Sequence, residues 1–356
     1  LLGGLEAGAT IIETHDGYVS RVHGSDPAVT VERLSAPDAA PAELGGVSGE
    51  PDALATLNLA FAPAPVRVRV SRGCRAKPVV VVHNVGAEAA ALFPRTLVEM
   101  EPLAEASMLE VVAGGPAALV VPVTEVDVAD GAHLGYLHVQ LLGSGAWQLG
   151  HQASRVGRDS SFVSAAVALG GGYARLRTGS SLVAPGAEGR LLALYFGSGR
   201  QMHDFRTVQH HSAPKTTSDL LYKGAVANSA RSVYSGLIRV EKGARGTNAL
   251  QTNRNLVLHE GAHADSVPNL EIEDNDVRCS HASAVGPIAS DQRFYLESRG
   301  VPPEVADRLI AIGFMDEVLE KLPFPAVAEP LRRLLVGKLA RAEAAEAAAG
   351  EREAGR

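Results

Sequence analysis

The chain has 356 residues, long enough for two ordinary domains or one elongated one, and 46% of them are hydrophobic. Its 33 lysines and arginines against 40 aspartates and glutamates give a net charge of -7, which excludes a broad basic face for nucleic acid or anionic lipid. The two cysteines, Cys74 and Cys279, support neither a disulfide framework nor a zinc site of four thiolates, and they favour a reducing, cytoplasmic setting.

No long apolar run of the kind that spans a bilayer occurs, so we expect no membrane span. The first residue is Leu1 rather than Met, so we expect the native start to be missing, and a removed signal peptide stays open. Residues 11–22 (IIETHDGYVSRV) predict two short strands around Asp16-Gly17, a dipeptide suited to a tight hairpin turn. Residues 35–52 are rich in Pro, Gly, Ala and acid and predict a flexible linker, so we expect an N-terminal segment over residues 1–64.

From residue 65 the chain becomes rich in aliphatic strand patterns, beginning with VRVRV and PVVVVHNV. Between about 96 and 288 it repeats a strand, a turn of small residues and another strand, most clearly from Gly224, Gly243 and Gly261 at spacings of 19 and then 18 residues. Repeats that cannot bury an apolar face alone are stabilised by stacking, which predicts a β-solenoid over residues 65–288. A β-sandwich of short strands is the alternative, although sandwiches seldom keep a near-constant period.

After Pro287 the pattern becomes helical. We expect Ser290 to cap a first helix, Gly300 to end it, and Pro303 to lie near the start of the next. This predicts a helical region over residues 289–340 and a charged, Ala-rich, solvated tail over residues 341–356. The expected apolar positions of the later helices are Val305, Leu309 and Ile312, then Val318, Leu319 and Leu322 in a separate helix, then Leu331, Leu334, Leu335 and Leu339.

Residues 259–263 read HEGAH and fit the H-E-x-x-H pattern of zinc metallopeptidases. Such a site needs both histidines on one helical face. Here the motif follows a strand pattern, and its residues 260–262 occupy the repeat position held by residues 242–244 and 223–225. We therefore interpret HEGAH as a turn of the repeat and keep a zinc hydrolase only as a minor alternative.

The stretch NDVRCSHASAVGPI, residues 275–288, carries the most informative pair of side chains. Side chains alternate faces along a strand, so Cys279 and His281 point the same way and Ser280 points the opposite way. A thiolate beside an imidazole offers two ligands suited to iron or to the edge of a cluster, too few to hold a cluster alone. The pattern therefore predicts a site completed by another chain. A buried apolar role for Cys279 with His281 as a satisfied polar neighbour stays open.

Other reactive residues point to chemistry less clearly. His203, His210 and His211 have no thiol or carboxylate at ligand spacing, so we expect them on the surface or in turns. Cys74 lies in a basic turn, and we interpret it as an incidental free thiol. No nucleophile elbow, Walker pattern or dinucleotide fingerprint occurs.

Acidic residues over 271–276 raise a second class of function, a calcium-dependent polysaccharide lyase built on a β-helix. Such an enzyme needs carboxylates for calcium and a basic residue for proton abstraction. Glu271, Glu273, Asp274 and Asp276 supply carboxylates. Because Glu271 and Glu273 share one strand face, we interpret them instead as the solvated side of a strand.

Residues 236–300, which include EKGARGTNAL, CSHASAVG and YLESRG, resemble the SufB/SufD family of iron-sulfur cluster assembly proteins. CSHASAVG has the SufD form, whereas SufB usually shows a Cys-Glu-His arrangement there. RGCRAKPVVVVHN, residues 72–84, is similar to the SufD entry into its solenoid. The likeness is strong over about 220–320 and weaker upstream, and the helical N-terminal region of many relatives is missing.

The resemblance implies a right-handed parallel β-helix with a C-terminal α-helical region, acting as a non-catalytic scaffold. The implied partners are a SufB-like paralogue, with a homodimer as the other pairing, and a SufC-like ATPase docked on the helices of residues 289–340. His281 matches the SufD histidine that faces a SufB cysteine where a transient iron-sulfur cluster would form, and Cys279 matches the cysteine two residues before it. The resemblance implies no tightly bound cofactor, no nucleic acid, no membrane and a cytoplasmic location.

Overall fold

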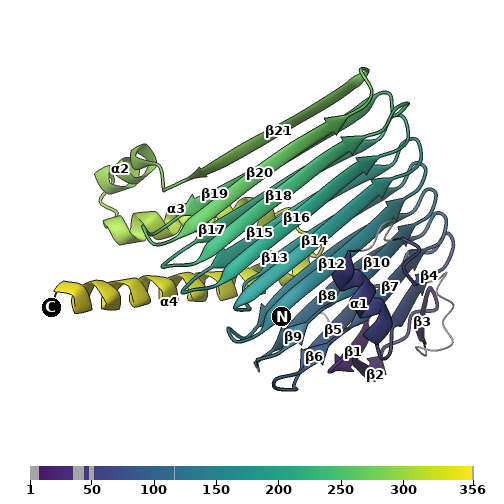
Figure 1. The fold of residues 1–356 in the computed structure, drawn as a ribbon, viewed down its shortest axis with the longest axis horizontal. Helices are drawn as coiled ribbons and strands as arrows, with labels where there is room; N and C mark the ends of the chain where they lie inside the picture. The colour runs from purple at the N-terminus through teal and green to yellow at the C-terminus, as the bar shows by residue number, and fades with distance from the viewer. Residues whose placement is uncertain (1–7, 35–43, 48–51, 116, 355–356) are drawn as a thin grey trace.

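A computed structural model describes residues 8–34, 44–47, 52–115 and 117–354. Over these residues the chain forms two large β-sheets that face each other, and successive strands alternate between the sheets (Figure 1). Consecutive strands within each sheet pair in parallel over most of its width, because each pair is separated by a return through the other sheet. This arrangement confirms the predicted β-solenoid. It excludes the β-sandwich, whose sheets are antiparallel.

The first sheet has ten strands among the described residues, in the spatial order β2-β1-β5-β8-β11-β13-β15-β17-β19-β21. The β1-β2 pair is antiparallel and forms the predicted hairpin, with positive φ at Asp16 and Gly17. The bounds of its strands are β1 Thr10–His15, β2 Tyr18–His23, β5 Val79–Val85, β8 Glu105–Gly114, β11 His133–Leu142, β13 Ser161–Ala168, β15 Glu188–Gly197, β17 Thr217–Val226, β19 Thr247–Val257 and β21 Val277–Gly286.

The second sheet has eleven strands among the described residues, and its main path runs β20-β18-β16-β14-β12-β10-β7-β4-β3. Two short strands, β6 and β9, pair beside β12. The bounds are β3 Val29–Arg33, β4 Val66–Val70, β6 Ala91–Leu92, β7 Arg95–Met100, β9 Leu119–Val120, β10 Val123–Val128, β12 Trp147–Val156, β14 Tyr173–Leu182, β16 Met202–His211, β18 Arg231–Val240 and β20 His263–Ile272.

One full coil of the solenoid is longer than the repeat expected from the glycines. Glu188 pairs with Thr217 and Thr217 with Asn248, so a coil takes 29 residues at the first step and 31 at the next. Gly224 was predicted to lie in a turn, but it lies inside β17. A Cβ there would come within 1.9 Å of the Tyr195 ring, so packing rather than chain reversal requires glycine. Gly243 does lie in a turn, with φ 93°.

A buried carboxylate lies between the sheets in the N-terminal half of the solenoid. Glu110, on β8, accepts hydrogen bonds from Thr96 Oγ1 at 2.6 Å, Thr124 Oγ1 at 2.7 Å, His83 Nε2 at 2.9 Å and the hydroxyl of Tyr136. Burial alone would raise the pKa of this carboxyl, but the hydrogen bonds and charges of the neighbouring histidines hold it well below its usual value. Every partner comes from a strand, so this polar network ties several coils together.

A helix that the sequence did not predict lies on the second sheet. The linker prediction falls partly outside the described residues, at 35–43 and 48–51, but it is followed by α1 (Ala53–Phe61), whose N-terminus is capped by Asp52. Asn58 anchors this helix. Its Nδ2 donates to two backbone carbonyl oxygens of the solenoid, at 2.9 and 2.7 Å, and Arg95 donates to its Oδ1.

The C-terminal region is helical, as predicted, with different boundaries. The helices are α2 (Ser290–Ser298), α3 (Pro303–Leu319), a short 3-10 turn at Pro325–Val327 and α4 (Ala328–Ala354). Ser290 is the first helical residue of α2 and not its cap, because Ala289 holds the N-cap position. Gly300 follows α2 with φ 85°, as expected of a helix stop. The boundary expected at residue 341 falls within α4.

Helices α3 and α4 pack against the outer face of the first sheet (Figure 1). Val318 and Leu319 continue α3 and do not start a separate helix, because they join the apolar cluster between the helices and the sheet. Val305 and Leu309 do not share the buried face with Ile312, and both are exposed. The cluster joins sheet and helix side chains that include Val139, Val167, Leu194, Ala311, Met315 and Leu335.

Candidate functional site

The last coil of the solenoid, β20 and β21, lies at the end of both sheets. β21 is the final strand of the first sheet and β20 the final strand of the second, at the upper edge of the molecule in Figure 1. An edge strand presents backbone N–H and C=O groups that no neighbouring strand pairs. Both sheets therefore end side by side with edges open to a further strand.

The inward face of this last coil is more exposed to solvent than the same face one coil earlier. In β18, the inward residues Ile238 and Val240 are fully buried by the next coil. Their register partners in β20, Leu270 and Ile272, are 37% and 41% exposed. Val285, on the inward face of β21, is similarly exposed. These exposed, inward-facing side chains form an apolar surface of the kind found at interfaces.

Cys279 and His281 both lie on this inward face, as the strand pattern predicted. In register they sit beside Ala249 and Gln251 of β19, which are buried between the sheets. Cys279 is half-buried against a cluster that includes Ile238 and Ala249, while His281 is exposed. The structure thus brings the thiol and the imidazole to one side of an open coil. Among the described residues no three His, Cys, Asp or Glu side chains gather as a metal-binding group.

The thiol of Cys279 is a weak ligand until something displaces its proton. Burial raises its pKa above the ordinary value, and a hydrogen bond with the backbone of Ala249 offsets this only in part. The thiolate is the form that binds metal, so the isolated chain holds Cys279 mainly as a neutral thiol at neutral pH. A thiol in this form binds metal only if its proton is displaced.

Gln251 is a residue of this site that the sequence did not single out. It is fully buried in register with His281, and neither atom of its side-chain amide has a hydrogen-bond partner. Across the coil, a Cβ on Gly236 would come within 2.2 Å of both Gln251 Nε2 and the Tyr234 hydroxyl oxygen, so glycine makes room for this polar pair. Polarity at an inward position was the available signal, since interior amides require partners.

The HEGAH stretch is a turn between β19 and β20, as interpreted. His259 lies in the turn, where its Nδ1 accepts from the backbone N–H of Asn228 at 2.8 Å and lies 3.3 Å from Glu346 of α4. His263 begins β20 and contacts Asp265. The two histidines have separate partners and do not share a helical face, so the zinc-hydrolase geometry is absent.

The histidines of β16 are a correction to the sequence prediction. His203 and His211 are fully buried in the strand, not on the surface or in turns, and burial is the main cause that lowers the pKa of His203 to about 3 and that of His211 to about 4. His210 faces outward and pairs with Glu241 at 2.7 Å. Cys74 lies in a turn and is half-buried.

Two of the four acidic residues over 271–276, Glu271 and Asp274, have structural partners. Asp274 accepts hydrogen bonds from the backbone N–H groups of Gly243 and Asp276, which lowers the pKa of its carboxyl. Glu271 faces Arg239 on the neighbouring strand at 3.7 Å. These contacts explain Asp274 as a turn group and Glu271 as a strand-face group, and they give no support to a calcium-dependent lyase.

Comparison with known proteins identifies the family. Residues 82–314, more than half of the chain, match the model of the SUF system FeS cluster assembly, SufBD core domain. The chain belongs to the SufBD family. Its matched region begins in β5 and ends in α3, so it includes the open coil with Cys279 and His281.

Curated relatives carry the same family description. An iron-sulfur cluster assembly SufBD family protein of Mycobacterium tuberculosis is 34% identical over 278 residues, 76% of this chain and 70% of that protein. The iron-sulfur cluster assembly protein SufD of Escherichia coli is 29% identical over 84% of this chain and 70% of its own. SufD of Bacillus subtilis is 32% identical over 61% and 50%, respectively. Within the described part of this SufBD-family chain, no helix is long and apolar enough to cross a membrane.

Proposed function

We propose that this SufBD-family chain is a non-catalytic, SufD-like scaffold that pairs with a SufB-like paralogue through its open last coil. A transient iron-sulfur cluster then forms between the two chains as cargo. A SufC-like ATPase docks on the C-terminal helices, and the complex works in the cytoplasm. In this proposal a second chain completes the site, because the ligands on this chain are too few to hold a cluster. The SufD form of the CSHASAVG stretch favours a SufB-like partner over a second copy of this chain.

One observation carries the proposal. The inward apolar positions of the last coil are exposed where those one coil earlier are buried, and Cys279 and His281 lie on that same uncovered face. A partner solenoid that continues both sheets would bury Leu270 and Ile272 and exclude water from the two ligands. Removal of water strengthens the interaction between a metal and its ligands.

In this proposal His281 and Cys279 contribute to cluster binding in different ways. His281 is exposed and can approach a partner's ligand without rearrangement. Cys279 must lose a proton whose pKa burial has raised, so iron binding releases one proton from this site when the thiolate forms. We therefore expect His281 to engage first, and Cys279 only once metal is present.

The ligand test uses the chain co-expressed with a SufB-like paralogue and a SufC-like ATPase. We expect His281→Ala to lower the iron and acid-labile sulfide of the purified complex, measured together with the visible absorbance of the cluster. Ser280→Ala is the matched control, since Ser280 lies on the same strand and points to the opposite face. If His281→Ala assembles as much cluster as Ser280→Ala, His281 has no part in the mechanism.

The pairing test uses charges on the two faces of β20. Leu270→Asp places a carboxylate on the inward, uncovered face and should abolish co-purification with the SufB-like chain. Val267→Asp is its control, because Val267 is also exposed and apolar but points outward. Equal retention of the partner by both variants would refute docking on the open coil.

Exposed apolar side chains on the C-terminal helices support docking of the ATPase there. Phe294 and Tyr295 on α2 are 71% and 58% exposed, and Leu309 on α3 is half exposed. Unlike the buried face of α3, these residues contribute nothing to packing on the first sheet. Phe294→Asp should therefore reduce co-purification of a SufC-like ATPase without changing the thermal midpoint of the isolated chain, and retention of the ATPase would place its docking elsewhere.

A further inference from the structure

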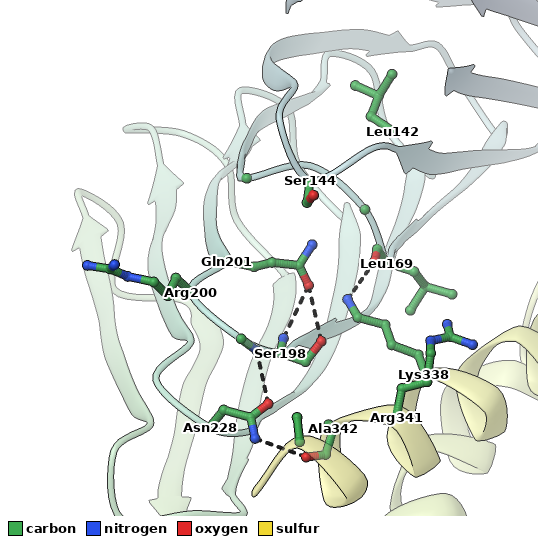
Figure 2. Close-up of a pocket in the computed structure, with 14 residues that line it drawn as sticks. Leu142, Ser144, Leu169, Ser198, Arg200, Gln201, Asn228, Lys338, Arg341 and Ala342 are labelled. Carbon is green, nitrogen blue, oxygen red and sulfur yellow. Dashed lines mark hydrogen bonds between the residues drawn. The ribbon is translucent and has the colours of Figure 1, made fainter. Parts of the chain in front are cut away.

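A pocket of about 500 Å³ lies between α4 and the turns of several coils. Its walls are the turns after β11, β13, β15 and β17, closed on one side by α4 (Figure 2). Three of its lining residues are basic, namely Lys338, Arg341 and Arg200, and none is an aspartate or glutamate. The described lining is therefore a concave surface of one charge sign.

Lys338 reaches from α4 into this pocket and is almost fully buried. Its Nζ donates to the carbonyl oxygen of Leu169 at 2.5 Å (Figure 2). It also donates to the carbonyl oxygen of Phe196, so it joins the ends of two neighbouring coils. An ammonium has three protons, so one donor remains for a further acceptor. Neutral carbonyls satisfy its hydrogen bonds but supply no opposite charge.

The surroundings of Lys338 disfavour the protonated form of its amine. Burial, and then the nearby guanidinium of Arg341, lower the pKa of this amine to about 7. No carboxylate contributes to this shift in return, and Glu346, further along α4, contacts Asn228 Nδ2 at 2.8 Å and His259 at 3.3 Å. An anion placed beside Lys338 and Arg341 would relieve both the desolvation and the repulsion.

The two arginines of the pocket have different orientations. The guanidinium of Arg341 lies beside Lys338, whereas the side chain of Arg200 points away from it (Figure 2). Both residues are exposed and carry the same charge. A guanidinium presents a planar pair of donors that matches the oxygens of a phosphate, and an ammonium adds a point charge.

We propose that this pocket binds a small oxyanion of the phosphate class, with Lys338 Nζ and the Arg341 guanidinium as its charged contacts. The site is separate from the open coil that carries Cys279 and His281, and the inference does not depend on cluster assembly. Because the ligand contacts α4 on one side and coil turns on the other, its binding also strengthens the attachment of that helix to the solenoid.

The test is calorimetric titration of the isolated full chain with inorganic pyrophosphate at pH 7 and constant ionic strength, with sodium chloride as the blank. We expect saturable binding. Arg341→Gln should weaken it by at least about tenfold, the effect of losing one charge-assisted contact. Arg200→Gln removes the same charge from the same pocket and should change the affinity by less than about twofold.

Lys338→Met should abolish binding, and far-UV circular dichroism checks that this variant is folded. If it is not, the pair of arginine variants decides. Heats indistinguishable from the chloride blank would overturn the proposal. Equal losses in Arg341→Gln and Arg200→Gln would also overturn it, since they would show attraction to general positive charge and not a site built around Lys338.

Discussion

The substitution Glu110→Gln tests how much the polar network inside the solenoid contributes to the free energy of unfolding. The carboxylate accepts four hydrogen bonds in a region that water does not reach. Removing one partner of a buried charged network costs about 3–5 kcal/mol. We expect a loss of about 3 kcal/mol, at the lower end, because the hydroxyls of Thr96 and Thr124 can rotate to accept from the new amide while the histidine N–H cannot.

The pH dependence of this loss follows from the direction of the pKa shift. The folded-state pKa of Glu110 lies well below 4.5, its ordinary value, so its carboxylate contributes stability that is fully present above about pH 4.5. That contribution is lost as the pH falls through the folded-state pKa. The gap between wild type and Glu110→Gln should therefore be constant from pH 7 to pH 5 and should narrow below pH 4.5.

Urea unfolding followed by far-UV circular dichroism measures both effects. Asp127→Asn is the control, because Asp127 pairs with Arg155 at a partly exposed position, and such pairs contribute less than about 1 kcal/mol. A Glu110→Gln loss no larger than that of the control at pH 7 would refute the idea that the network stabilises the coils. A gap that widens in acid would refute the direction of the pKa shift.

Three further predictions concern single positions. Alkylation of Cys279, followed by mass spectrometry, should be slower than that of a free cysteine at pH 7 and should accelerate above pH 9, because burial raises the pKa of its thiol; equal rates at pH 7 would contradict this. Asn58→Ala should lower stability by about 2–4 kcal/mol, since it leaves two backbone carbonyls of the solenoid without their donor, while Leu59→Ala on the exposed side of α1 should cost less than about 1 kcal/mol in the same thermal melt. Gly236→Ala should lower the free energy of unfolding by about 2–3 kcal/mol through overpacking. Gly286→Ala, whose added Cβ meets nothing within 4 Å, should be near neutral. Similar melting points for the two variants would show that the neighbours of Gly236 move aside at little cost.

The strand architecture was predictable from the sequence because it depends on local patterns. The Asp16-Gly17 hairpin and the turn at residues 259–263 both follow from residues whose backbone preferences act over a few positions. The register of the coils was not predictable in the same way. Gly224 resembles a turn glycine in the sequence, yet it is required by the ring of Tyr195, which lies a whole coil away.

The helices show the same limit. Val318 and Leu319 were expected in a separate helix, but Gly313, which lies before them inside α3, costs only about 1 kcal/mol relative to alanine. Helix α3 continues through it since Met315 and Leu319 bury against the first sheet and more than offset that cost. Helix α1 was missed because its anchoring residue is Asn58, a polar side chain that faces inward.

The shared strand face of Cys279 and His281 was predictable from the sequence, but the exposure of that face was not. Strand alternation placed Cys279 and His281 on one face, and this is confirmed. Nothing in the sequence of β20 distinguishes Leu270 from the buried Ile238, because the difference lies only in whether another coil follows. Lys338 was overlooked for a related reason, since a lysine near the end of a charged helix reads as solvated.

The dimensions of the last coil restrict what can add to it. β20 and β21 each contain ten residues and end the two sheets together. A lone extended peptide satisfies one of these edges and leaves the other unpaired, whereas a chain coiled with the same width and strand length pairs with both at once. Strand length thus serves as a criterion of recognition that favours a relative of the same architecture over an unrelated segment, before any individual side chain is compared.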